Sequence, residues 1–366
     1  MFPGKCEAAR QMIRSTGRRE DKKMLHFASD YMEGAHPRIL ERLTETNLEK
    51  TPGYGTDFYC SRAADRIRTA CRCPEARVFF LTGGTQTNAV VIDGILESWQ
   101  GVVCAESGHI NTHEAGAIEH SGHKVLALPQ KDGKLEADVL EAYLKNFFCD
   151  ENREHMTEPG MVYISHPTEI GTLYTASELC RLQEICQFYS IPLYLDGARL
   201  GYGLAADPEV DLPLIAECCD VFYIGGTKVG ALLGEAAVIT NPHLLRRFFT
   251  IVKQHGGLLA KGRLLGVQFD ELFTDDLYLK ISENAVRLAG KLQNALKKMG
   301  YRLKTESPTN QIFVTIPDEV KSKLEPKVSF SFWEKADETH TTVRFATSWA
   351  TEEADVDALI SLLEKC

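Results

Sequence analysis

Asp196 and Lys228 are two residues whose positions in this chain could support chemistry. Asp196 ends the apolar run of IPLYLDGAR, and α/β sheets place their ligands at such strand ends. A carboxylate there can bind a metal, another cation, a ribose hydroxyl or a protonated ring nitrogen. It can equally be a helix cap or a turn residue, so Asp196 alone does not decide between these functions.

Lys228 follows another apolar run, DVFYIGGTKVGALLGEA, among glycines and small residues. This is not the solvated helical face that lysines favour. A lysine that loses solvation has a lowered pKa and becomes an amine nucleophile toward aldehydes, whereas a lysine in a surface turn does not. Thr227, beside it, could donate its hydroxyl to a phosphate or could be a turn residue.

The string LTGGTQTNAV, at 81–90, predicts a strand, a glycine-rich turn and the start of a helix. Free backbone N–H groups at a helix N-terminus bind anions. The string lacks the Gly-Lys-Ser/Thr ending of a nucleotide-binding P-loop and the GxGxxG spacing of a dinucleotide site. It therefore favours a single phosphate on Gly84, Thr85 and Gln86, with an ordinary strand-to-helix turn as the alternative.

Taken in order along the chain, these features predict a pyridoxal 5'-phosphate (PLP) site. The phosphate of PLP needs a helix N-terminus, its ring nitrogen needs a carboxylate, and its aldehyde needs an amine. We predict that Lys228 holds the cofactor as a Schiff base and that Asp196 holds its ring nitrogen. Arg199 could pair with Asp196 or bind an anionic part of the ligand.

Strand-like and helical segments alternate between about residue 37 and residue 255. The predicted strands are 77–81, 101–105, 123–128, 160–165, 192–196, 220–225 and 235–240. Helical patterns lie at 37–50, 84–99, 135–147 and 176–189. This alternation predicts an α/β fold with a mostly parallel, seven-stranded sheet covered on both faces.

The pattern changes after about residue 256. Two long helical segments, 258–273 and 277–299, precede predicted strands at 301–305, 311–316, 328–333 and 341–347 and a helix at 352–365. We therefore expect a flexible N-terminal extension at 1–24, a large cofactor-binding domain at 25–255 and a small α+β domain at 256–366.

The composition narrows the class of protein. The 366 residues are 44% hydrophobic and 25% charged, as in a globular protein, and the net charge of −10 argues against nucleic acid or a membrane as the main partner. The 11 cysteines show no CxxC spacing, which favours a reducing cytoplasmic location. The basic first 23 residues lack the apolar core of a secretory signal.

Further strings accompany these motifs through nearly the whole chain after residue 24. They are SDYMEGAHPRIL, TPGYGTD, GGTQTN, GHINTHEAGAIE, DGARLG, YIGGTK, GGLLAKGRLLG, SPTNQIF and RFATSW. With them the chain resembles the fold-type I PLP enzymes, whose fold is that of aspartate aminotransferase. Within that group it resembles the threonine aldolase and β-eliminating lyase family, in its low-specificity L-threonine aldolase-like branch.

The resemblance implies roles for several more residues. His109 would stack on the cofactor ring and relay protons, and Arg344 and Ser29 would bind the substrate carboxylate together with Arg199. Lys261, or the nearby Lys253 or Arg263, would reach a phosphate across a dimer interface, and Tyr54 could do the same. His166 lies near the position of a family histidine that handles the substrate β-hydroxyl; it could replace that base or contact the ring.

Two positions depart from the family pattern. Thr168 stands where the β-hydroxyl histidine is expected, and Ser348 stands where a histidine usually follows the late arginine. No metal site is expected, because the glutamate of an HExxH motif is missing beside His109 and His113.

The resemblance implies a lyase that cleaves a β-hydroxy-α-amino acid of the L-threonine or L-allo-threonine type to glycine and an aldehyde. β-Elimination, racemisation and transamination of another amino acid remain alternatives, as does a non-catalytic binding protein. A homodimer or homotetramer is implied in the same way, with a small amino acid as the only other partner.

Overall fold

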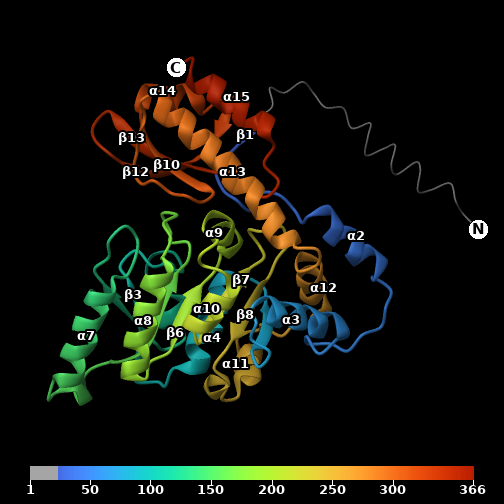
Figure 1. Cartoon of the computed structure of the whole chain (residues 1–366), viewed down its shortest axis with the longest axis vertical. Helices are drawn as coiled ribbons and strands as arrows, with labels where there is room; N and C mark the ends of the chain where they lie inside the picture. Colours follow the sequence, from blue (N-terminus) through green and yellow to red (C-terminus); the bar gives the residue numbers. More distant parts are fainter. Residues whose placement is uncertain (1–23) are drawn as a thin grey trace, which may run out of the picture.

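The computed structural model describes residues 24–366, and the expected N-terminal extension at 1–24 lies outside them except for Met24. The described part consists of a large α/β region and a smaller region with its own sheet, joined by the long helix α13 (Leu277–Lys298), drawn in orange in Figure 1. No helix of the described residues is long and apolar enough to cross a membrane.

The large sheet has seven strands in the order β2-β8-β7-β6-β5-β3-β4. Their bounds are β2 Arg77–Leu81, β3 Gln100–Ala105, β4 Lys124–Leu128, β5 Glu158–Ser165, β6 Leu193–Asp196, β7 Val221–Gly225 and β8 Glu235–Ile239. Only β8 runs antiparallel to its neighbours. The central strands β5 to β8 are almost wholly buried, which explains why their sequences are continuously apolar.

Helices cover both faces of this sheet. One face packs on α2 (Pro37–Glu45), α3 (Phe58–Ala70), α7 (Ala137–Cys149), α8 (Ala176–Tyr189), α9 (Leu200–Ala206), α10 (Leu212–Cys218), α12 (Arg263–Leu272) and the start of α13. The other packs on α4 (Gly84–Ile95), α5 (His109–Thr112), α6 (Ala117–His120) and α11 (Phe248–Gln254). Short 3-10 helices occupy Arg153–His155 and Pro242–Leu244.

The small region contains a four-stranded antiparallel sheet. Its strands, in the order β12-β13-β10-β9, are β9 Arg302–Leu303, β10 Gln311–Pro317, β12 Ser331–Lys335 and β13 His340–Ala346. The helices α14 (Asp318–Leu324) and α15 (Glu353–Leu363) lie beside it in Figure 1. The short strands β1 (Leu25–His26) and β11 (Val328–Ser329) pair with each other in parallel.

The observed elements confirm the predicted α/β class and the smaller second sheet. Several boundaries differ: the first helix ends at Glu45 rather than 50, α4 ends at Ile95 rather than 99, and α12 begins at Arg263 rather than 258. The strand expected at 328–333 is divided into β11 and β12. The domain division near residue 256 stays a proposal, since β1 pairs with β11 and α12 packs on α3 across it.

Candidate active site

A cavity of about 290 Å³ opens where β5, β6 and β7 reach their carboxyl ends, the edge at which α/β sheets bind ligands. Lys228, Asp196, His109, Arg199 and the turn before α4 all line it. The complete lining is Tyr31, Thr82, Gly83, Gly84, Thr85, His109, Ser165, Pro167, Glu169, Asp196, Ala198, Arg199, Tyr223, Thr227, Lys228 and Glu235. The fold thus brings together the three features that predicted the cofactor.

Asp196 is held as a buried carboxylate. Its Oδ2 accepts hydrogen bonds from the Tyr163 hydroxyl at 2.6 Å and the Asn88 amide at 3.0 Å, and its Oδ1 accepts one from the backbone N–H of Ala198 at 3.0 Å. Burial alone would raise the pKa of Asp196, but the positive charge of His109 and the donated hydrogen bonds outweigh it and lower the pKa. The residue is therefore a fixed negative charge in the cavity wall.

His109 begins the short helix α5, and its ring orientation is fixed by Glu114. Its Nδ1 lies 2.7 Å from Glu114 Oε1, which also accepts from the Asn88 amide at 2.7 Å. Burial opposes protonation, yet the Glu114 hydrogen bond and the charges of Asp196 and Glu114 raise the pKa of His109. One face of the ring stacks on His113 with centroids 5.7 Å apart, which leaves the other available for a flat ligand.

Lys228 has the lowered pKa expected of an amine nucleophile. Burial is the main cause, and the nearby positive charge of Arg199 acts in the same direction. Glu235 lies beside it at the start of β8, where it accepts a hydrogen bond from the Gly226 backbone N–H at 2.9 Å. Burial raises the pKa of Glu235 to about 7, so this carboxyl group titrates near neutrality.

The turn before α4 presents unused donors to the cavity. Among residues 24–366, no acceptor takes the backbone N–H groups of Gly84, Thr85 or Gln86. The Gln86 side chain instead bridges the Thr82 hydroxyl, at 2.7 Å, and the His255 carbonyl, at 3.1 Å, so only its backbone is free. The Thr227 hydroxyl accepts from the Gly234 backbone N–H at 3.0 Å.

Arg199 reaches the cavity from the end of β6, and Asp30 fixes its direction. Its Nε donates to Asp30 Oδ2 at 2.7 Å and its Nη2 donates to Oδ1 at 3.0 Å. Asp30 is buried and Arg199 is partly buried. An ion pair was one of two roles that the sequence left open for Arg199, with Asp196 as the expected partner. The observed partner is Asp30 instead.

Arg344 contacts Ala28, the residue before Ser29, and neither Ser29 nor Arg344 lines the cavity. Arg344, on β13, donates to the Ala28 carbonyl at 3.0 Å and to Gln311 Oε1 at 3.1 Å. Its Nε is buried and has no acceptor among the described residues. Burial lowers the pKa of His113 most, and the positive charges of His109 and then Arg344 lower it further. Arg344 therefore lies near the stacked rings of His109 and His113.

His166 and Lys261 are not brought to the cavity. The His166 ring is fully buried behind the wall, its Nδ1 accepts from the Tyr174 backbone N–H at 3.3 Å, and burial lowers its pKa to about 4. Lys261 is exposed in the segment before α12. This segment contacts the turn of TPGYGTD, since the Tyr54 N–H donates to the Leu259 carbonyl at 3.1 Å.

Sequence reasoning missed several polar residues of the site: Asp30, Asn88, Glu114, Tyr163, Glu169 and Glu235. Two signals were available. Asn88 is four residues after Gly84, so both lie on the same face of α4, and Glu235 begins a strand that pairs with the strand before Lys228. The partners of Asp30, and the contact of Glu169 with His109, join residues distant in sequence and could not be read from it.

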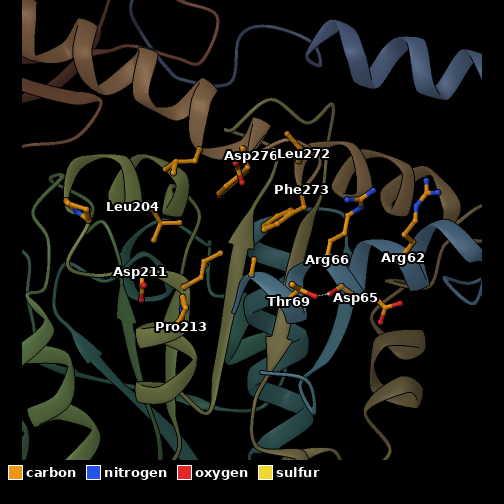
Figure 2. Close-up of a pocket in the computed structure, with 15 residues that line it drawn as sticks. Arg62, Asp65, Arg66, Thr69, Leu204, Asp211, Pro213, Leu272, Phe273 and Asp276 are labelled. Carbon is orange, nitrogen blue, oxygen red and sulfur yellow. Dashed lines mark hydrogen bonds between the residues drawn. The ribbon is translucent and has the colours of Figure 1, made fainter. Parts of the chain in front are cut away.

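A second, larger cavity of about 690 Å³ lies between α3, α12, α13 and the segment around α10 (Figure 2). Figure 2 shows Arg62 and Arg66 on α3 at one side and Leu204 and Asp211 at the other. No lysine lines it, so it offers no amine to an aldehyde.

Two solved structures share the fold of this chain over almost its whole length. A single mutant of Thermus thermophilus aspartate aminotransferase matches it with a TM-score of 0.68 at 13% identity, over 100% of this chain and 97% of that one, which shows the shared fold. The structure of Leishmania major threonine aldolase matches with a TM-score of 0.90 at 38% identity, over 93% of this chain and 98% of that one.

The family follows from the sequence comparison. The beta-eliminating lyase model matches residues 26–319, and the chain belongs to this family. The low specificity L-threonine aldolase of Pseudomonas sp. strain NCIMB 10558 is 30% identical over 338 residues, which cover 91% of this chain and 95% of that protein. These matches confirm the resemblance seen in the motif strings.

Proposed function

We propose that this chain is a PLP-dependent lyase that cleaves a β-hydroxy-α-amino acid of the L-threonine type to glycine and an aldehyde. The observation that carries the proposal is one cavity lined by a partly buried lysine of lowered pKa, a buried ionised aspartate and a turn with free N–H groups. Membership of the beta-eliminating lyase family and similarity to two proteins named threonine aldolase support it.

The residues of the cavity fit PLP by their chemistry. Lys228 supplies the amine for the aldehyde, Asp196 supplies the negative charge for a protonated ring nitrogen, and the turn from Gly84 to Gln86 supplies donors for the phosphate. His109 offers a free ring face for stacking. When bound, PLP withdraws electrons from the α-carbon of an amino acid, and a cationic ring beside Asp196 does this best.

We assign the substrate carboxylate to Arg344 and Ser29, with Arg199 beside them. Arg344 has a buried Nε–H without a partner in the described residues, and an anionic ligand would give this donor an acceptor. Its fixed planar guanidinium suits a carboxylate, and the bound carboxylate decides which α-carbon bond faces the cofactor.

The experiment is to incubate purified protein, loaded with PLP, with a panel of β-hydroxy amino acids and to identify the products. We expect glycine together with an aldehyde, and no product from the Lys228→Ala variant. Pyruvate and ammonia from serine would favour β-elimination instead. No turnover of any amino acid, with or without added PLP, would favour a binding protein on the same fold.

We further propose that the protein acts in the reducing cytoplasm as a homodimer or homotetramer. The ten cysteines of the described part are all free thiols, as expected for a reducing compartment. Lys261 and Tyr54 lie in contacting surface segments, and in an oligomer Lys261 could bind a cofactor phosphate in the neighbouring subunit. Loss of PLP affinity in Lys261→Ala, measured on the oligomer, tests this role.

A further inference from the structure

Retro-aldol cleavage needs a group that takes the proton of the substrate β-hydroxyl, and the expected candidates are not available. Thr168 is buried, and its hydroxyl lies 2.6 Å from that of Thr172. His166 is buried, accepts from a backbone N–H and has a pKa of about 4. The Ser348 hydroxyl donates to Glu33 at 3.0 Å. None of the three lines the cavity.

Glu169 is a carboxyl group in the cavity wall to which no role has yet been assigned. It follows β5 by four residues, and its Oε1 accepts from the Ser165 hydroxyl at 2.6 Å and from the His109 backbone N–H at 2.9 Å. These two bonds attach it to the end of β5 and to the residue that offers a ring face to the cofactor. No group of another described residue donates to Oε2, and this oxygen is not among the buried atoms that lack a partner. Oε2 is therefore not fully buried, and the Glu169 side chain lines the cavity.

The electrostatic setting suits proton exchange. Burial raises the pKa of Glu169, and the negative charge of Asp196 raises it further, against the hydrogen bonds from Ser165 and the backbone. A carboxyl group whose pKa is raised toward neutral pH can both take up and release a proton. The other cavity carboxylates are less suitable: Asp196 is saturated with donors, and Glu235 lies against the Gly226 backbone beside Lys228.

We propose that Glu169 is the catalytic base that accepts the β-hydroxyl proton. The inference rests on the proposed aldol cleavage. The O–H bond breaks and its proton moves to Oε2 of Glu169, while the oxygen electrons form the aldehyde C=O. The Cα–Cβ bond breaks, and its electron pair returns to Cα with one proton to give glycine. No oxidant or reductant is needed.

The variant Glu169→Gln tests this role, because the amide can keep the acceptor contacts of Oε1 while losing the ability to take a proton. We expect kcat for cleavage to fall by about 10²- to 10⁴-fold. Exchange of the glycine α-proton in heavy water needs no β-hydroxyl base, so we expect it, and the PLP dissociation constant, to stay within about threefold. Glu184→Gln, on an exposed face of α8, is the matched control and should match wild type in all three measurements.

The outcomes distinguish failure of the Glu169 proposal from failure of the proposed function. Cleavage within about threefold of wild type, or an equal loss of cleavage and glycine exchange, would overturn the role of Glu169 while leaving the proposed function intact. Absence of aldehyde from the wild-type protein would overturn the proposed function itself. If Glu169→Gln does not fold, Glu169→Asp should keep partial cleavage with the acid limb of its kcat profile moved to lower pH, and an unmoved limb would contradict the proposal.

Discussion

Arg199 and Asp30 form a two-point ion pair in the interior, with Nε to Oδ2 at 2.7 Å and Nη2 to Oδ1 at 3.0 Å. Asp30 also accepts from the Asn310 amide at 2.9 Å. The pair therefore ties the N-terminal segment, the end of β6 and the small region together at the cavity. Burial would raise the pKa of Asp30, but Arg199 lowers it to about 2.

We expect Asp30→Asn to lower the free energy of unfolding by about 3–5 kcal/mol, because it leaves Arg199 as a largely enclosed cation, with its side chain 14% exposed, without its counter-charge. Urea denaturation at pH 7 and fixed protein concentration measures this. The matched control is Asp65→Asn, which removes an exposed carboxylate paired with Arg68 and should cost at most about 1 kcal/mol. Equal small losses in both variants would contradict the structural role of the pair.

The pKa of His166 gives a pH dependence with a definite sign. Its folded-state pKa of about 4 lies below the ordinary 6.5, so the unfolded chain binds this proton more readily. Its contribution to stability is complete above pH 6.5 and is lost as the pH falls toward 4. Between pH 7 and pH 5 we expect wild type to lose about 1–2 kcal/mol more than His166→Gln. Identical losses in urea titrations would show that His166 is not buried as a neutral ring.

Asp196→Asn tests the partner of the ring nitrogen. The amide keeps the size of the side chain and removes the charge, so we expect PLP still to attach at Lys228, as seen by visible absorbance. Because a ring without its proton is a poorer electron acceptor, kcat should fall by about 10²-fold or more. A variant with normal kcat would show that the charge of Asp196 does not support the reaction.

Arg344→Lys tests carboxylate binding. Lysine keeps the charge but loses the planar two-point donor geometry, so we expect kcat/KM for any amino acid substrate to fall by about 10-fold or more, with PLP affinity unchanged. Arg302→Lys, on the exposed surface of β9, is the control. If both variants had the same kcat/KM, Arg344 would not bind the substrate carboxylate and would have only a structural role.

The sequence predicted the parts of the fold that local chemistry determines. Helix α8 was expected at 176–189 and is found there, because Thr175 and Glu178 form a reciprocal cap at its start. The meeting of Lys228, Asp196 and the Gly84 turn was also predictable, since the ends of neighbouring parallel strands share one edge of the sheet.

What the sequence could not reveal is the direction of individual side chains and the contacts between distant segments. His166 and Ser165 are adjacent, yet Ser165 lines the cavity and His166 lies behind its wall. The pairing of Asp30 with Arg199 joins residues far apart in the chain, and no local periodicity encodes it. Helix α3 was not predicted, although Asp57 caps its first turn.

The most direct test of the cofactor site is to bind PLP to the purified protein, reduce the complex with borohydride and locate the modified lysine by peptide mass spectrometry. Reduction fixes the link between the aldehyde and its amine permanently. We expect the pyridoxyl group on Lys228, at close to one per chain, with the yield unchanged in Glu184→Gln. Modification of another lysine, or none at all, would contradict the account.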